Sequence, residues 1–218
     1  MRNRGHQANL ILQGVMNMPT SGLRSAPEAV PARTADVFRT AAELMVEKGY
    51  GGTSIGDIAQ AVGMTKAGLY HHISGKQDML YEILNYAMDE LDRVVTTPVR
   101  LIEDPEERLR QLIRLHIQGS IEHGLVFTVL MSEMTHLAPK QQKRIMGRIE
   151  EYHALIRDTL QELAGKRRLR KLDVNIATMH IMKTITGVAR WRYQDFTSDA
   201  EHLIQETIAY TMAALLKP

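Results

Sequence analysis

Residues 63–78 read GMTKAGLYHHISGKQD, and this stretch raises three structural possibilities. Its glycines and Lys76 suggest a phosphate-binding loop, but such a loop needs two glycines four residues apart, then Lys and Ser or Thr, after a strand. Here Gln77 follows the lysine. The adjacent His71 and His72 suggest a metal site, but neighbours on a helix point about 100° apart and no third ligand lies nearby at helical spacing. Neither hypothesis survives.

The third possibility, a helix-turn-helix, fits the stretch. Two short helices that cross over a tight turn need small or flexible residues at defined offsets. Ala59 lies at the expected crossing, Gly63 at the turn and Leu69 where the second helix would pack on the core. Thr65 stands at the start of the second helix, where its hydroxyl and the free backbone amides suit phosphate oxygens.

The charge distribution supports a nucleic-acid partner more than the net charge does. The 218-residue chain carries 27 Lys and Arg against 25 Asp and Glu, a net charge of only +2. No carboxylate occurs between Asp57 and Asp78, however, whereas this interval holds Lys66, His71, His72 and Lys76. We therefore expect a local positive face on a nearly neutral protein.

Composition limits the other possibilities. The chain has no cysteine, which excludes disulfides, thiolate metal sites and cysteine nucleophiles and fits the cytoplasm. No apolar run approaches about eighteen residues, so we expect no membrane span. No Ser/His/Asp set or phosphate loop indicates an enzyme, and no cofactor or metal is expected.

Apolar spacing is helical from residue 33 onward, and no segment alternates convincingly as a strand does. The predicted fold class is therefore all-α, with about nine helices in a compact N-terminal bundle and a larger C-terminal one. The predicted helices cover about 33–49, 54–62, 65–73, a segment from 74 or 75 past 88, 104–124, 125–136, 139–165, 173–193 and 198–216.

Residues 33–85 resemble the TetR family of bacterial transcriptional regulators. The residues that carry the resemblance are Gly49-Tyr50, Thr53, Asp57-Ile58-Ala59, Gly63, Thr65-Lys66, Leu69-Tyr70-His71-His72, Gly75-Lys76 and Leu80. Ile73 departs from the pattern, because the family usually has phenylalanine there. The polar composition of residues 1–32, rich in proline and glycine, predicts a flexible tail. The resemblance implies a three-helix DNA-binding domain at 33–80 and a ligand-binding and dimerisation domain at 81–218.

The resemblance also implies roles in DNA binding. Phosphate contacts are expected from Ser54, Thr65, Tyr70, His72 and Lys76. Base contacts are expected from Lys66, Ala67, Gly68 and His71. Because Gly68 has no side chain and Ala67 offers only a methyl group, direct readout would depend on Lys66 and His71.

Family members usually act as homodimers that release operator DNA when a small molecule binds, so we expect a repressor of this kind. The segment Gly187–Tyr193 resembles members that sense acyl-CoA thioesters, whose apolar tail and polyanionic head suit methionines and arginines. The candidate ligand-binding residues are His116, Phe127, Met131, Met134, Arg157, Trp191 and Arg192. Plain core packing, or a dimer-interface role for Trp191, is the alternative. Three roles remain open for the basic run 166–171. It is simply solvated, or it contacts the phosphates of CoA, or it contacts DNA that flanks the operator.

A rival hypothesis is a di-iron carboxylate oxidase. Glu133-x-x-His136 and Glu150-x-x-His153 match half of the ligand pattern of such helical bundles. The two pairs lie on either side of Pro139, however, and not on well-separated antiparallel helices. The regulator is therefore the main prediction and the oxidase the alternative.

Overall fold

The structure is a computed structural model that describes residues 31–71, 73–191 and 199–217, with the side chains of 188–191 left aside. The predicted tail lies almost entirely outside these residues. The described residues form helices and one isolated antiparallel bridge between Leu169 and Leu216. The all-α prediction is therefore confirmed.

The first part of the chain contains α2 (Ala32–Gly52), α3 (Ile55–Ala61), α4 (Lys66–Tyr70) and α5 (Lys76–Leu91), and α5 continues through a π-helical turn, η1 (Asp92–Thr96), into α6 (Thr97–Arg100). The second part contains α7 (Pro105–Glu122), α8 (Gly124–Ser132), the 3₁₀ turn η2 (Met134–His136), α9 (Pro139–Gly165), α10 (Val174–Trp191) and α11 (Ala200–Leu215). If Lys76–Arg100 is counted as one rod, the described ranges hold nine α-helices, as predicted.

Local signals determine most helix ends. Gly49 and Gly63 adopt positive φ values of 73° and 66°, which glycine tolerates best, and each interrupts a helix where predicted. Asp104 accepts hydrogen bonds from the amides of Glu106 and Glu107 and caps α7. The last helix was expected to open with a capping box formed by Ser198 and Glu201, but Ser198 lies outside the described residues. Asp199 caps α11 by accepting from the amide of Glu201.

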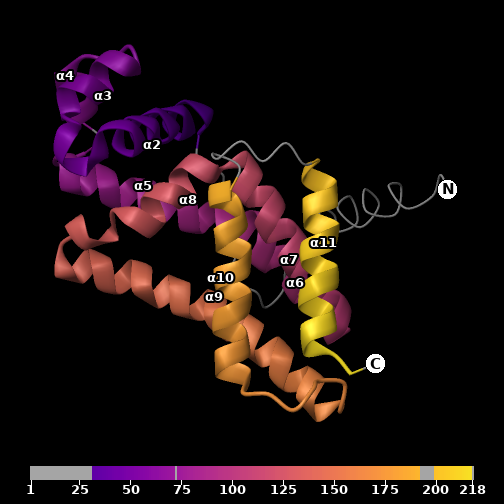
Figure 1. The fold of residues 1–218 in the computed structure, drawn as a ribbon. Helices are drawn as coiled ribbons and strands as arrows, with labels where there is room; N and C mark the ends of the chain where they lie inside the picture. The colour runs from indigo at the N-terminus through magenta and orange to yellow at the C-terminus, as the bar shows by residue number, and fades with distance from the viewer. Residues whose placement is uncertain (1–30, 72, 192–198, 218) are drawn as a thin grey trace.

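The two parts of the molecule share α5 and are joined again by α8. Figure 1 shows α2, α3 and α4 at one end, with α5 running from them into the larger bundle. Helix α8 packs against both α2 and α5. The boundary predicted between residues 80 and 81 falls inside α5, so the first unit continues into the second without a linker.

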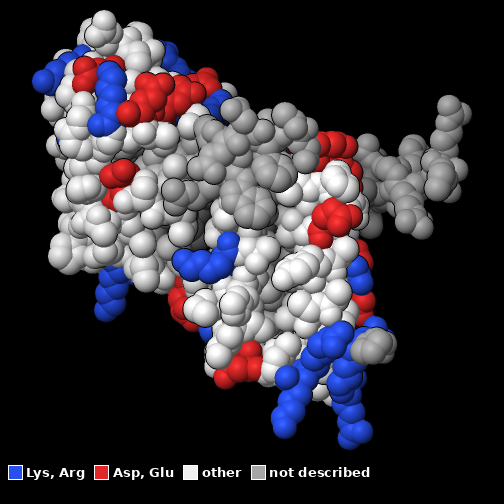
Figure 2. All heavy atoms as spheres, viewed as in Figure 1, with Lys and Arg blue, Asp and Glu red and all other residues white. Residues whose placement is uncertain are grey.

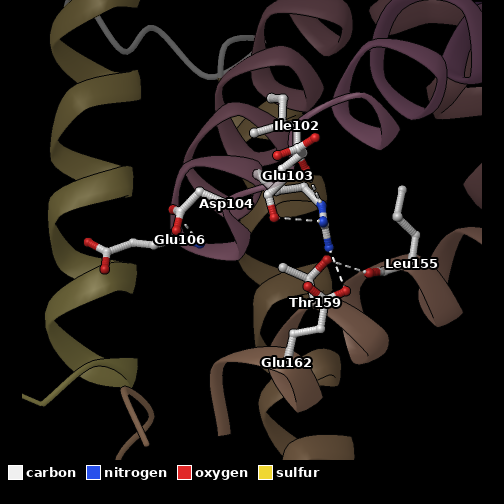
Figure 3. A network of polar contacts seen from close by, with 8 residues as sticks. Ile102, Glu103, Asp104, Glu106, Leu155, Thr159 and Glu162 are labelled. Atoms are coloured by element: carbon white, nitrogen blue, oxygen red, sulfur yellow. Dashed lines mark hydrogen bonds and ion pairs between the residues drawn. The ribbon is translucent and has the colours of Figure 1, made fainter. Parts of the chain in front are cut away.

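A polar network fastens the start of α7 to α9. Arg108 donates to the backbone carbonyls of Ile102 and Glu103, at 2.8 and 3.2 Å. Its guanidinium also pairs with Glu162 of α9 at 2.8 Å (Figure 3). Since the arginine is mostly buried, the network holds the first turn of α7 in place against α9.

None of the helices among the described residues combines the length and the apolar character needed to cross a membrane.

Candidate nucleic-acid interface and effector domain

The α3–α4 unit has the crossing predicted from its small residues. Ala59 and Leu69 are buried, and the amide of Met64 bonds to the carbonyl of Ala59 at 2.9 Å across the turn. Gly63 provides the left-handed conformation between them. The two helices therefore pack closely, and their relative orientation is fixed by the core.

Hydroxyl caps organise the starts of both helices. The Ser54 hydroxyl accepts from the amide of Asp57 at 3.1 Å, and the Asp57 carboxylate accepts from the amide of Ser54 at 2.8 Å. These hydrogen bonds lower the pKa of Asp57. Thr65 caps α4 by accepting from the amide of Gly68 at 3.0 Å. Ser54 and Thr65 are both exposed, so each keeps a hydroxyl proton at the surface.

The expected base-facing residues lie on the open side of α4. Lys66, Ala67 and His71 are exposed, and Tyr70 is 47% exposed although it is a large aromatic residue. Gly68 is partly covered, and a Cβ atom there would lie 3.1 Å from the Thr65 hydroxyl oxygen. The glycine therefore leaves room for the cap. His72 lies outside the described residues.

Lys76 is more constrained than a free surface lysine. Its ammonium donates to the backbone carbonyl of Tyr50 at 2.9 Å and lies 4.4 Å from the centre of the Tyr50 ring. The ammonium is thus already bound within the protein, at the first residue of α5. The predicted phosphate contact would have to share this lysine with Tyr50.

The candidate ligand residues of the C-terminal part have different environments. His116 of α7 is buried, Phe127 and Met134 are half-buried, and Met131 is 61% exposed. Arg157 of α9 pairs with Glu150 at 3.1 Å. The side chain of Trp191 and all of Arg192 lie outside the description. His116 is therefore interior, whereas Met131 faces solvent.

The polar partner of His116 is Tyr152. Its Nδ1 lies 2.9 Å from the Tyr152 hydroxyl, and the two rings are stacked with centroids 5.7 Å apart. Burial lowers the pKa of His116 to about 4 and raises that of Tyr152. The imidazole is thus neutral at pH 7, in a buried polar pair that joins α7 to α9. The sequence identified His116 as a candidate ligand residue but gave no sign that Tyr152 is its partner.

The di-iron alternative is not supported. Glu133 lies 3.4 Å from His136, and Glu150 lies 3.8 Å from His153, so each pair is formed within its own segment. Nowhere in the described ranges do three or more His, Cys, Asp or Glu side chains gather in a way that could hold a metal ion. The two Glu-x-x-His pairs therefore do not come together into one metal site.

His136 instead contacts the N-terminal unit. Its ring stacks on that of Tyr50, with centroids 4.5 Å apart and planes 15° from parallel. Sequence reasoning missed this contact because it considered His136 only as an iron ligand. Gly49-Tyr50 was visible as part of the family pattern, but nothing in the sequence indicated its partner.

The basic run 166–171 lies away from α3 and α4. Lys166, Arg167, Arg168, Arg170 and Lys171 are exposed. Figure 2 shows basic side chains gathered beside the C-terminus, at the opposite end of the molecule from α4 in Figure 1. The bridge between Leu169 and Leu216 anchors the run to the end of α11.

Comparison with known proteins gives this arrangement a family. A family model described as the C-terminal domain of tetracycline-repressor-like proteins matches residues 103–215, and one for bacterial regulatory proteins of the tetR family matches residues 37–83. The transcriptional repressor KstR2 of Mycobacterium tuberculosis is 25% identical over 190 residues, which cover 86% of this chain and 95% of the relative. The transcriptional activator FasR of Mycolicibacterium smegmatis is 22% identical over 184 residues, 84% of this chain and 83% of the relative.

Solved structures agree. AibR in complex with isovaleryl coenzyme A and operator DNA is 28% identical, with a TM-score of 0.76 over 82% of this chain and 97% of that chain. The structure of KstR2 of Mycobacterium tuberculosis, 24% identical, has a TM-score of 0.78 over 89% of this chain and 100% of that chain and shares the fold. Because one family model spans half of the sequence and the other matches the helix-turn-helix, the chain belongs to the TetR family of bacterial regulatory proteins.

Proposed function

We propose that this protein is a transcriptional repressor that binds operator DNA as a homodimer and is released by a small-molecule effector. The observation that carries the proposal is the Thr65-capped α4, which exposes Lys66, Tyr70 and His71 on one side of a helix-turn-helix. An exposed helix start with free amides and cationic neighbours suits the phosphate backbone and the major groove. The protein would act on the chromosome in the cytoplasm.

Each side chain on this face has a proposed role. Ser54, Thr65, Tyr70, His72 and Lys76 bind phosphates, and Lys66, Ala67, Gly68 and His71 face the base edges. Lys66 and His71 carry the hydrogen-bonding groups, so they contribute most to sequence preference. The division of labour follows the proposed domains, with residues 33–80 on DNA and residues 81–218 binding the effector and the second subunit.

The proposed effector is an acyl-CoA thioester. AibR, which was solved with isovaleryl coenzyme A and operator DNA, supports this class. His116, Phe127 and Met134 would provide a mostly apolar interior with one neutral polar pair, and Arg157 would offer charge for phosphates. Met131, Trp191 and Arg192 complete the proposed set. Among the relatives, KstR2 is a repressor and FasR is an activator. The proposal that this protein represses transcription follows its similarity to KstR2.

Binding of DNA is tested with fragments from upstream of the protein's own coding region, titrated at several salt concentrations. We expect specific binding with a steep salt dependence, because phosphate contacts release counterions. Tyr70→Phe should weaken it and Lys66→Ala should relax its sequence preference, while Lys143→Ala, which removes an exposed lysine of α9, serves as the matched control. Absence of specific binding to every upstream fragment would contradict the proposal.

The effector is tested by adding isovaleryl-CoA, longer acyl-CoA thioesters and the free acids to the DNA complex. A thioester should lower DNA affinity, and DNA should lower the affinity for that thioester by the same factor, because coupling between two binding equilibria is reciprocal. If no thioester shifts the DNA affinity, the acyl-CoA assignment fails while the DNA-binding assignment stands.

A further inference from the structure

The C-terminal part of the chain contacts the helix-turn-helix unit through a stacked pair of rings. His136 ends η2, the short turn between α8 and α9, and Tyr50 follows Gly49, where α2 leaves helical geometry. The two rings lie nearly parallel with centroids 4.5 Å apart. Burial raises the pKa of Tyr50, which fits a ring covered by its neighbours. This contact joins segments that are distant in sequence.

The same pair holds the first turn of α5. Lys76 donates to the carbonyl of Tyr50 at 2.9 Å, and its ammonium lies 4.4 Å from the centre of the Tyr50 ring. Gln77 donates to the backbone carbonyl of His136 at 2.8 Å, a bond that does not involve the imidazole ring. The first two residues of α5 are therefore each attached to one member of the pair. We refer to Tyr50, Lys76, Gln77 and His136 as the hinge cluster.

The hinge cluster lies beside a helix start that lacks a side-chain cap. Gly75 precedes α5 and offers no capping oxygen, so the first amides of α5 are not satisfied from that position. Ser74 is instead tied to Asp78 through its amide and hydroxyl, at 2.9 and 3.0 Å. The orientation of this turn thus depends strongly on side-chain contacts made by Lys76 and Gln77.

Glu133 also contacts the His136 ring. Its carboxylate lies 3.4 Å from Nε2 of His136, within the turn that follows α8. Helix α8 in turn packs against α2 and α5. The His136 side chain is 48% exposed, so its ring is kept on Tyr50 mainly by the stacking contact and not by deep burial.

We propose that His136 is a positioning residue for DNA binding. Its ring holds Tyr50, and through Tyr50 it holds the start of α5, in the geometry that lets Lys76 and the neighbouring amides approach a phosphate. Operator affinity therefore depends on a residue that lies outside the helix-turn-helix and touches no DNA. This inference rests on the proposed DNA-binding function.

The test compares three variants of the full-length protein. His136→Ala removes the ring, His136→Phe keeps a planar ring without the imidazole nitrogens, and His153→Ala is the matched control. His153 belongs to the second Glu-x-x-His pair and lies half-exposed on α9 beside Glu150. We expect DNA affinity to fall about tenfold in His136→Ala, and to stay within about twofold of wild type in the other two, because stacking survives in the phenylalanine variant.

A second measurement separates this inference from the proposed function. Hydrogen exchange of the free protein should show faster exchange across residues 66–80 in His136→Ala and unchanged exchange there in His153→Ala. Equal DNA affinities for His136→Ala and His153→Ala, or a His136→Phe variant as weak as His136→Ala, would overturn the positioning role. If the wild type binds no upstream fragment, the proposed function fails. Hydrogen exchange still tests the positioning role by itself, because unchanged exchange at residues 66–80 in His136→Ala would refute it.

Discussion

Thr65 has two functions that can be measured separately. Its hydroxyl oxygen accepts from the amide of Gly68 at 3.0 Å, which caps α4, and its exposed proton is proposed to reach a phosphate. Thr65→Ala should lower the free energy of unfolding by about 1 kcal/mol, the usual cost of losing such a cap. Urea denaturation measures this change. Thr65→Ser keeps the hydroxyl and should stay close to wild type, so an equal loss in both variants would contradict the capping role.

His116 makes stability depend on pH. Its pKa is lowered by burial from 6.5 to about 4, so the folded state holds the neutral imidazole and the unfolded state binds the proton more readily. Above pH 6.5, the titration of His116 should therefore leave the free energy of unfolding unchanged. As the pH falls from 6.5 toward 4, this free energy should decrease by up to about 3 kcal/mol.

Denaturation curves across this pH range check the prediction. His116→Gln cannot titrate but can still bond to the Tyr152 hydroxyl, so its stability should vary less with pH than that of the wild type. His202→Gln removes an exposed histidine that does not line the groove between α10 and α11, and it should keep the wild-type dependence. If both variants follow the wild-type curve, His116 is not the group responsible.

Contacts local in sequence could be predicted, and distant ones could not. The caps at Ser54, Thr65 and Asp104 formed as expected because a cap needs only residues two or three positions away. The stack of His136 on Tyr50 depends on how α8 packs against α2, which no local pattern encodes. The DNA-facing residues remain a prediction, although four of them share the open side of α4.

At the scale of elements, Arg148 fastens α9 to the rod formed by α5, η1 and α6. Its guanidinium lies 2.7 Å from Asp89 and 2.8 Å from Asp92, and donates to the carbonyl of Asn85 at 3.3 Å. Arg148→Ala leaves two neighbouring carboxylates without their cation, and we expect a loss of about 1–2 kcal/mol in the free energy of unfolding, since the pair is partly exposed.

Arg110→Ala is the matched control for Arg148→Ala. Arg110 pairs with Glu106 one turn away on the same helix, at 3.0 Å. Such a pair contributes little, so we expect a change within about 0.5 kcal/mol. Thermal denaturation of both variants measures the difference. Equal losses would indicate that Arg148 does not join the two elements energetically.

The end of α9 has a conformation that suits glycine better than its arginine. Arg167 has a positive φ of 57°, and its amide bonds to the carbonyl of Ala164 at 2.9 Å in the turn that ends the helix. Because a Cβ atom disfavours this conformation, Arg167→Gly should raise the free energy of unfolding by about 0.5–1 kcal/mol. Arg167→Ala removes the same charge but keeps Cβ. Calorimetry that finds equal stability for the two variants would attribute any gain to charge and not to backbone conformation.

Helix ends were predicted correctly where capping or helix-breaking residues mark them in the sequence. Helix α9 spans Pro139–Gly165, the limits predicted from a proline at its first position and a glycine at its end. For the helix expected from 74 or 75 past 88 no end was predicted, and the rod runs from Lys76 to Arg100. It passes Pro98 through the π turn, in which the amide of Thr97 bonds to the carbonyl of Asp92. A proline normally ends a helix, and sequence alone gave no sign of this exception.

At the scale of the whole molecule, α10 and α11 present an apolar surface to solvent. Ile176 and Met179 of α10 are each 54% exposed, and Tyr210 of α11 is 74% exposed. Ile176 and Tyr210 line a groove between the two helices that also includes Ala177 and Ala214. Large exposed apolar patches mark contact surfaces. A face built from two neighbouring helices can pack on a copy of itself about a two-fold axis.

This face is therefore the expected dimer interface, and its disruption should affect DNA binding indirectly. Met179→Glu and Tyr210→Glu place charges where two copies would meet, and analytical ultracentrifugation should show monomers at concentrations where the wild type is a dimer. Each monomer reaches only one half-site, so DNA affinity should fall even though α4 is unchanged. Met146→Glu, at a methionine of α9 that is 48% exposed, is the matched control and should remain dimeric. If Met146→Glu dissociates while Met179→Glu stays dimeric, the subunits meet through α9, and the surface of α10 and α11 must have another partner.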